Sequence, residues 1–346
     1  MKKRMFFMVI ILSANLLLGA GFGRTRSKDR PAWFDNPSAL YPEKEYLVAR
    51  GAGDTQEAAE DNAAANLAKI FKSDISIDQT TRERYSAFSK LGDTMDELLE
   101  TEIDQTVRVA AGEILYNVKF SDPYTDNMGR VHILAYLNRQ ETAKIYRDKI
   151  NANFEKIQFL LNEAESTSDP ITRYACLNAC YAISTLNQSM LDQISIIHPL
   201  SYNMLTALNE ELSLTFISKK RAEAAKNLTF SVSINGDDGR VTSMVSETIS
   251  NMGFPLIENT GIIHVTGNIA FEEVDLKRND AEFIGWNLTL KVVGPEDITL
   301  VEINTKGREG GVSKEAAKRT ALREIGKSVG PKLENQLMAY FDHRIL

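Results

Sequence analysis

The chain has 346 residues, of which 43% are hydrophobic and 25% are charged, and its formal net charge is −7. This composition is that of a globular protein long enough for more than one domain, and it excludes intrinsic disorder as the main state. The acidic balance argues against nucleic acid or an anionic membrane surface as the main partner.

The first residues have the pattern of a secretory signal. Basic residues 2–4 precede an apolar run over 5–12, and the segment ends in small residues. Because the run is shorter than the roughly 20 apolar residues of a spanning helix, we expect a cleaved signal peptide over residues 1–23, with a retained N-terminal anchor as the alternative.

A lipid anchor is not predicted. Leu17-Leu18-Gly19 begins like a lipoprotein processing box, but Ala20 stands where the lipid-accepting cysteine is required. We therefore expect an exported protein that is periplasmic or associated with the outer membrane.

The first predicted module covers residues 31–138. A short apolar strand over 46–49 ends in Gly51-Ala52-Gly53, and Asp54 or Thr55 caps an alanine-rich helix that runs to Phe71. Alternating residues then predict a strand over 74–78. Further along, the pattern predicts a helix from Thr94 to Val109 and two strands, 114–120 and 131–137, joined by a turn-rich hairpin connection. The order is βαβαββ, with a mainly antiparallel sheet and helices on one face.

A helical spacer is predicted over residues 139–226. Apolar residues recur there at helical intervals, Pro170 starts a second helix, and His198-Pro199 interrupts the pattern before a third. Three antiparallel helices would form a spacer or a partner-binding bundle.

The spacer also contains the only cysteines, Cys176 and Cys180. They share one face of a helix, where a disulfide would be strained, so we interpret them as buried apolar thiols.

The last module, residues 227–346, has the predicted order βαβββα. Strands are expected at 228–234, 262–274, 283–293 and 298–305, with one helix ending at Gly253 and a closing helix beginning at Ser313. The predicted fold class is therefore α+β, with two small sheet-and-helix modules joined by an antiparallel helical bundle.

No catalytic, cofactor or metal site is predicted. The four histidines, His132, His198, His264 and His343, lie in different elements and form no ligand spacing. The turn 235–239 lacks both the Lys-Ser/Thr of a phosphate loop and the final Glu of a calcium loop, which favours a plain turn and helix cap. The carboxylates at 100–102 and 272–275 are interpreted as solvated surface, so we expect a protein that is not an enzyme.

Trp33 and Phe34 are the candidate partner contact. They are two large aromatic residues between Pro31 and Pro37 in a leading segment, and such side chains can fill a groove on a partner. The alternative is that they cover the edge or end of their own sheet.

Two resemblances follow from these motifs. Pro31-Ala32-Trp33-Phe34, the run from Tyr46 to Gly53 and the Glu57-Ala58-Ala59 helix resemble the bacterial surface lipoprotein domain called Lpp-twenty, which is similar to the N-terminal part of the flagellar assembly protein T. The resemblance covers roughly residues 31–140. The C-terminal module resembles more loosely the fold shared by the curli secretion component and by lipoprotein activators of penicillin-binding proteins.

The resemblances imply envelope assembly or scaffolding, with no catalytic residues to transfer. The first hypothesis is a scaffold or assembly factor whose partners are other envelope proteins or a second copy of itself. The second is a regulator of a cell-wall synthase that acts through the C-terminal module. The third, a periplasmic hydrolase, requires a pocket with convergent titratable groups.

Overall fold

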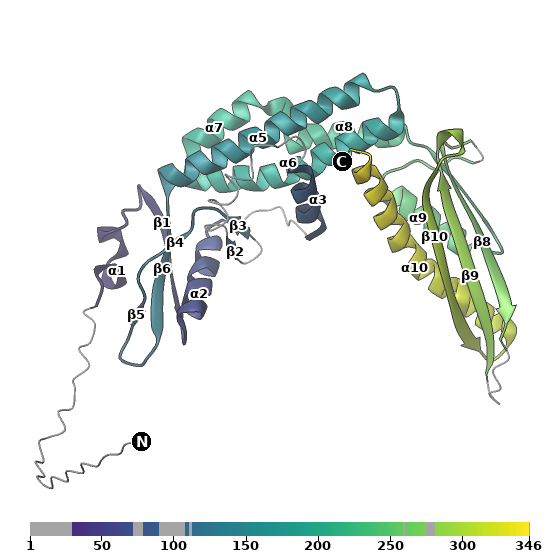
Figure 1. Ribbon diagram of the computed structural model, residues 1–346, viewed down its shortest axis with the longest axis horizontal. Coiled ribbons are helices and arrows are strands. Elements are labelled where there is room, and N and C mark those ends of the chain that lie inside the picture. Colours follow the sequence, from purple (N-terminus) through teal and green to yellow (C-terminus); the bar gives the residue numbers. More distant parts are fainter. Residues whose placement is uncertain are drawn as a thin grey trace, which may run out of the picture.

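The protein has the shape of an arch (Figure 1). The structure, a computed structural model, describes residues 30–71, 79–89, 108–110, 113–258, 260–274 and 281–345. Four helices form a layer across the top, and a sheet-and-helix module extends from each end of this layer. The predicted α+β class with two small modules is confirmed. The expected signal peptide lies outside the described residues.

The N-terminal module is an antiparallel sheet with one helix packed closely on it. Strand β1 (Tyr46–Gly53) pairs with β6 (Val131–Asn138), which also pairs with the short strands β4 (Lys119–Phe120) and β5 (Tyr124–Thr125). Helix α2 (Gln56–Ala68) begins after Thr55, whose side chain accepts a hydrogen bond from the Ala58 amide, so Thr55 rather than Asp54 is the cap. The helix lies so close to β1 that a Cβ at Gly51 would be 2.2 Å from the Ala59 carbonyl oxygen.

The middle of this module differs from the prediction. The expected strand 74–78 and most of the expected helix 94–109 lie outside the described residues. The prediction is wrong at the end of that helix, because Arg108–Ala110 forms strand β2, paired with β3 (Glu113–Leu115). The expected strand 114–120 is broken into β3 and β4 at Asn117, where φ is +59° and the side-chain amide donates to the Thr142 hydroxyl. A helix that was not predicted, α3 (Gln79–Ser89), packs against the helical layer.

The helical layer contains one more helix than expected. Its elements are α5 (Arg139–Ser166), α6 (Pro170–Ile197), α7 (Pro199–Leu208) and α8 (Leu214–Lys226). The predicted third helix is divided into α7 and α8 by a 3₁₀ turn, Glu210–Leu212, after which the Ser213 hydroxyl caps a new helix by accepting from the Phe216 amide. Helix α6 contacts α5, α7 and α8 and is buried along most of its length.

The two cysteines lie inside this layer as buried, unlinked thiols, as predicted. Burial and the nearby Glu163 charge raise the pKa of Cys176 to about 11, and burial raises the pKa of Cys180 further above its usual range.

We expect neither thiol to react with a thiol reagent at pH 8 in the folded protein. A thiol with a pKa near 11 is only about 0.1% thiolate at that pH, and burial blocks the reagent as well. Labelling with a coloured disulfide reagent should be slow without denaturant and should reach two thiols per chain when the protein unfolds. Rapid labelling of the folded protein would contradict this assignment.

The C-terminal module matches its predicted order. It consists of β7 (Phe230–Asn235), α9 (Arg240–Asn251), β8 (Ile263–Glu273), β9 (Glu282–Val293), β10 (Thr299–Gly311) and α10 (Lys314–His343). The sheet order is β10-β9-β8-β7, with β7 parallel to β8 and the other pairs antiparallel. Both helices lie on one face of this sheet (Figure 1).

The end of α10 fixes this module to the helical layer. Tyr174 of α6, Phe254 and Phe341 form a buried aromatic cluster, with the Tyr174 and Phe341 ring centroids 4.8 Å apart. Arg84 of α3 makes a two-pronged ion pair with Asp342, at 2.7 and 2.8 Å. These contacts join α3, α6 and α10 at one point.

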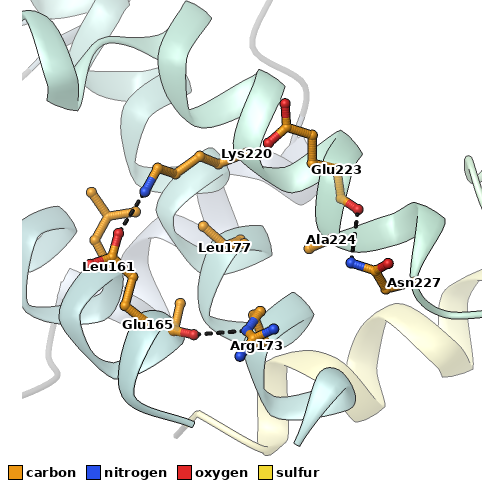
Figure 2. Close-up of a pocket in the computed structure, with 9 residues that line it drawn as sticks. Leu161, Glu165, Arg173, Leu177, Lys220, Glu223, Ala224 and Asn227 are labelled. Carbon is orange, nitrogen blue, oxygen red and sulfur yellow. Dashed lines mark hydrogen bonds and ion pairs between the residues drawn. The ribbon is translucent and has the colours of Figure 1, made fainter. Parts of the chain in front are cut away.

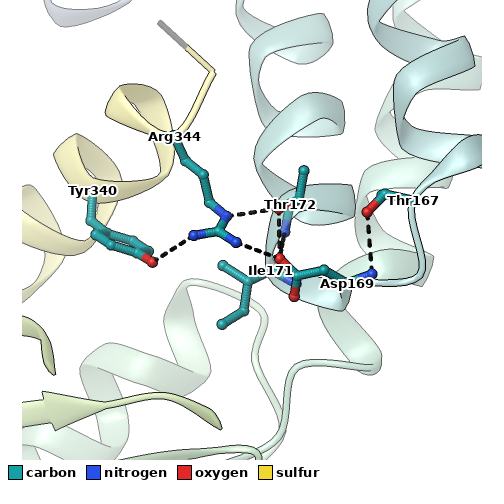
Figure 3. Close-up of polar contacts among 6 residues, drawn as sticks. All are labelled: Thr167, Asp169, Ile171, Thr172, Tyr340 and Arg344. Atoms are coloured by element: carbon teal, nitrogen blue, oxygen red, sulfur yellow. Dashed lines mark hydrogen bonds and ion pairs between the residues drawn. The ribbon is translucent and has the colours of Figure 1, made fainter. Parts of the chain in front are cut away.

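A second polar contact lies beside this cluster (Figure 3). The Arg344 guanidinium contacts Asp169, the residue that caps α6, at 2.7 Å, and it also donates to the Thr172 hydroxyl and the Tyr340 hydroxyl. Because Asp169 accepts from the first amides of α6 as well, the start of α6 and the end of α10 share one carboxylate.

At the other end of the arch, the N-terminal module joins the layer without a linker. β6 ends at Asn138, and the Asn138 side chain caps α5 by accepting from the amides of residues 140 and 141. The next residue, Arg139, donates to the Ile196 and Ile197 carbonyl oxygens at the end of α6. Among the described residues, no helix combines the length and apolar composition that a membrane span requires.

Candidate functional site

The N-terminal segment, residues 30–45, lies across the sheet face opposite α2. Gly51 faces α2, so its neighbours on β1 face the other way, as do their partners on β6, including Leu134. Leu134 is fully buried although it lies on the face that α2 does not cover. The segment that covers it contains the short helix α1 (Ala32–Asp35) and a 3₁₀ turn, Pro37–Ala39.

Phe34 is the centre of an aromatic cluster on this face. Its ring meets those of Tyr124 and His132 edge-on, with centroid distances of 4.9 Å in both cases. The Arg30 guanidinium lies 4.5 Å from the Phe34 ring centroid, and that of Arg50 lies 6.0 Å from it. Phe34 is half-buried, so this cluster is a surface that combines an aromatic ring with two cations.

Trp33 has a different environment from its neighbour. Its side chain is only 5% exposed, because it packs into its own module. The position of Trp33 corresponds to the alternative that the two aromatic residues cover their own sheet. They cover a face of this sheet, however, and not its edge or end. The accessible member of the pair is Phe34, and its contact with a partner stays a prediction.

A tyrosine cluster extends the same face. Tyr41 stacks near Tyr136 of β6, at a centroid distance of 4.5 Å, and Tyr46 of β1 completes the group. Burial and the proximity of the Tyr136 hydroxyl raise the pKa of Tyr41 above its usual value, so it stays neutral at physiological pH. Ring packing therefore holds this tyrosine cluster.

Most of this face is not predicted from the sequence. Alternation along β6 places His132, Leu134 and Tyr136 on one side, which is the signal that a second covered face exists. The same period on β1 places Tyr46 and Arg50 on this side as well, where Arg50 pairs with Leu134. The sequence contains no pattern that assigns the leading segment, residues 30–45, to this face.

His132 has a structural partner. Its Nε2 lies 2.8 Å from the Asp126 carboxylate, and this hydrogen bond, with those from the Arg130 and Met128 amides, lowers the pKa of Asp126. Asp126 thus stabilises the turn between β5 and β6 through these hydrogen bonds. His132 connects this turn to Phe34, because its ring contacts both Asp126 and Phe34.

The other histidines are distributed as predicted. His198 caps α7 through the Ser201 amide, and the His264 Nδ1 lies 2.7 Å from the Ser231 hydroxyl on the C-terminal sheet. His343 ends α10. Across the described part of the chain, no group of three or more His, Cys, Asp or Glu residues is placed to hold a metal ion.

The turn 235–239 begins helix α9. The Asp237 carboxylate accepts hydrogen bonds from the Val241 and Thr242 amides, so a side chain of the turn already satisfies the first amides of the helix. Gly236 and Gly239 both have positive φ. Of the carboxylate groups, Glu273 pairs with Lys314 at 2.6 Å, while residues 100–102 and Asp275 lie outside the described residues.

A cavity of about 350 Å³ lies between α5, α6 and α8 (Figure 2). Three of its four charged side chains have partners: Lys220 pairs with Glu165 at 2.6 Å, and Arg173 donates to the Ala164 and Thr167 carbonyl oxygens, while the fourth is Glu223. The Lys220 ammonium lowers the pKa of Glu165 by hydrogen bonding and charge. A catalytic carboxylic acid near neutral pH requires the opposite shift, so this cavity supports no assignment of a reaction.

Comparison with known proteins gives distant structural likenesses. No curated protein matches the chain. The secreted protein HP1454 of Helicobacter pylori has a TM-score of 0.43 and 11% identity, over 85% of this chain and 98% of that one. A minor lipoprotein of Acinetobacter baumannii has a TM-score of 0.26 and 9% identity, over 33% and 92% of the two chains. A PelC dodecamer of Paraburkholderia phytofirmans has a TM-score of 0.22 and 16% identity, over 31% and 86%. Likenesses at this level carry no functional argument.

The family comparison concerns the N-terminal module. A family model described as LPP20 lipoprotein matches residues 31–138, from the Pro31-Ala32-Trp33-Phe34 motif to the end of β6. This match fits an envelope-associated, lipoprotein-like protein. The looser resemblance of the C-terminal module to curli secretion and synthase-activator proteins stays a prediction. The resemblance predicted from the first motifs is confirmed: over residues 31–138 the chain matches the LPP20 lipoprotein family.

Proposed function

We propose that this protein is a non-catalytic scaffold or assembly factor of the bacterial envelope, in the periplasm or at the outer membrane. The observation that carries the proposal is the direct attachment of both modules to one helical layer. Asn138 ends a strand and caps a helix at one junction, and the Phe341 cluster with the Arg84–Asp342 ion pair closes the other. Such an arch holds two binding surfaces at a fixed separation, as a scaffold requires.

The face around Phe34 is the proposed contact with other envelope proteins. It lies in the module that matches the lipoprotein family, and it presents a half-buried ring with the Arg30 and Arg50 guanidinium groups 4.5 and 6.0 Å from the ring centroid. Aromatic rings and arginines are the residue types that dominate protein interfaces. Because Trp33 and Tyr41 anchor the segment beneath it, Phe34 is presented in a fixed position.

The proposal is tested by photo-crosslinking in cells. A photoreactive phenylalanine is introduced at position 34 and, in a matched control, at position 159, because Phe159 on α5 is 62% exposed and far from the N-terminal face. We expect covalent adducts with other envelope proteins from position 34 and not from position 159, and Phe34→Ala should abolish co-purification of the same proteins.

Adducts with the protein itself alone, or the same adducts from both positions, would contradict this contact. A purified cell-wall synthase that turns over faster when the protein is added would instead support the regulator hypothesis.

A further inference from the structure

The C-terminal sheet has one long edge that is open in the described part of the chain. Strand β10 has 13 residues and pairs on one side with β9. At the opposite edge, β7 has six residues and is partly covered, because the Phe230 amide donates to the Pro255 carbonyl oxygen and the Ile257 amide donates to the Phe230 carbonyl oxygen. An open strand edge is a row of unpaired backbone donors and acceptors that another strand can complete.

The side chains of β10 on the face away from the helices form an ordered row. Val301 and Ile303 are buried toward α10, so the alternate residues Glu302, Asn304, Lys306 and Arg308 lie on the other face and are all exposed. Glu302 has one loose ion pair, 3.8 Å from Lys291. Among the described residues, Lys306 and Arg308 form no ion pair.

This row is complementary to a second copy of itself. If two β10 strands pair antiparallel about a twofold axis at Thr305, Glu302 of each copy lies opposite Arg308 of the other, and Asn304 lies opposite Lys306. On the sheet face that α10 covers, the same register places Thr305 of one copy opposite Thr305 of the other. A negative charge at one end of the row and positive charges at the other are what antiparallel self-pairing requires.

We propose that β10 is a self-association edge, through which two copies join their four-stranded sheets into one eight-stranded sheet. The contact is isologous, because each copy gives and receives the same strand. A single strand pair buries little area, so the dimer is weak and depends on concentration. The proposed edge is separate from the Phe34 face and does not depend on that contact.

The first test is sedimentation of the protein purified in its exported, processed form, with charge variants. We expect the monomer mass at about 1 μM and twice that mass at about 100 μM. Arg308→Glu and Glu302→Arg should each weaken the dimer by about tenfold or more, because each places like charges opposite one another twice.

The double variant, Glu302→Arg with Arg308→Glu, should restore the dimer, and an equimolar mixture of the two single variants should form a mixed dimer. Circular dichroism of each variant verifies that the monomer is folded. A monomer at every concentration, or a dimer unaffected by Arg308→Glu, would overturn the proposal.

The second test locates the twofold axis. Thr305→Cys should form a disulfide-linked dimer under mild oxidation, whereas Thr289→Cys on the adjacent inner strand should not. The native Cys176 and Cys180 are buried and do not interfere. Equal crosslinking at both positions would rule out pairing through β10, and it would leave the test of the Phe34 contact unaffected.

Discussion

Phe341→Ala is expected to cause the largest loss of stability in the C-terminal half, about 3–5 kcal/mol in the free energy of unfolding. Phe341 is fully buried and packs against both Tyr174 of α6 and Phe254. Its removal leaves a cavity at the point where α10 meets the helical layer, and it loosens the neighbouring Arg84–Asp342 ion pair. Denaturant unfolding followed by circular dichroism measures the change.

Phe159→Ala is the matched control for this prediction. The same side chain is removed, but Phe159 is 62% exposed, so the expected change stays within about 0.5 kcal/mol. Should both variants lose the same stability, the aromatic junction would not be what holds the module. Because Trp286 lies in the C-terminal module and Trp33 in the N-terminal one, tryptophan variants can assign the loss to one end of the arch.

Gly51→Ala is expected to destabilise the N-terminal module by about 3 kcal/mol or more. The added Cβ would lie 2.2 Å from the Ala59 carbonyl oxygen and 2.2 Å from the Ala63 amide nitrogen, and both are backbone atoms of α2 that no rotamer change can move. Overpacking of this kind displaces the helix from the sheet. Thermal unfolding followed by Trp33 fluorescence detects it.

Gly285→Ala is the control for Gly51→Ala, because it adds the same methyl group at a strand residue that no helix backbone approaches closely. A Cβ at Gly285 would meet the Val274 side chain at 3.3 Å, and a side-chain methyl group can shift by a few tenths of an ångström. We expect a small change there, partly offset by the lower entropy of the unfolded alanine chain. A loss at Gly285 as large as that at Gly51 would show that close helix packing is not the cause.

The sequence predicted those elements whose side chains have one clear period. Strands β6, β8 and β9 and helices α5, α6 and α10 have apolar residues at strand or helix spacing, and their caps, such as Ser313, are explicit. The end of β10 was missed because Lys306 to Gly311 has no apolar alternation. Pairing with β9, which is a tertiary contact, extends the strand there.

The candidate site could be predicted only in part. The Trp33-Phe34 pair was recognisable as two large aromatic residues, but their separation into a buried ring and an accessible one depends on how the leading segment crosses the sheet. The break at Asn117 is similar, because a positive φ in a strand pattern depends on its hydrogen bond to Thr142 in another element. Both features result from contacts between distant parts of the chain.

Because β6 passes directly into α5 at Asn138, the orientation of the N-terminal module about the α5 axis is fixed by the length of the chain at this junction. With no intervening loop to absorb a change, one residue inserted after Asn138 would turn the N-terminal module about the α5 axis by roughly 100° and advance it by about 1.5 Å. The direction in which the Phe34 face points is therefore set by helix phase. An insertion at this junction keeps the orientation of the face only when its length is close to a whole number of helical turns.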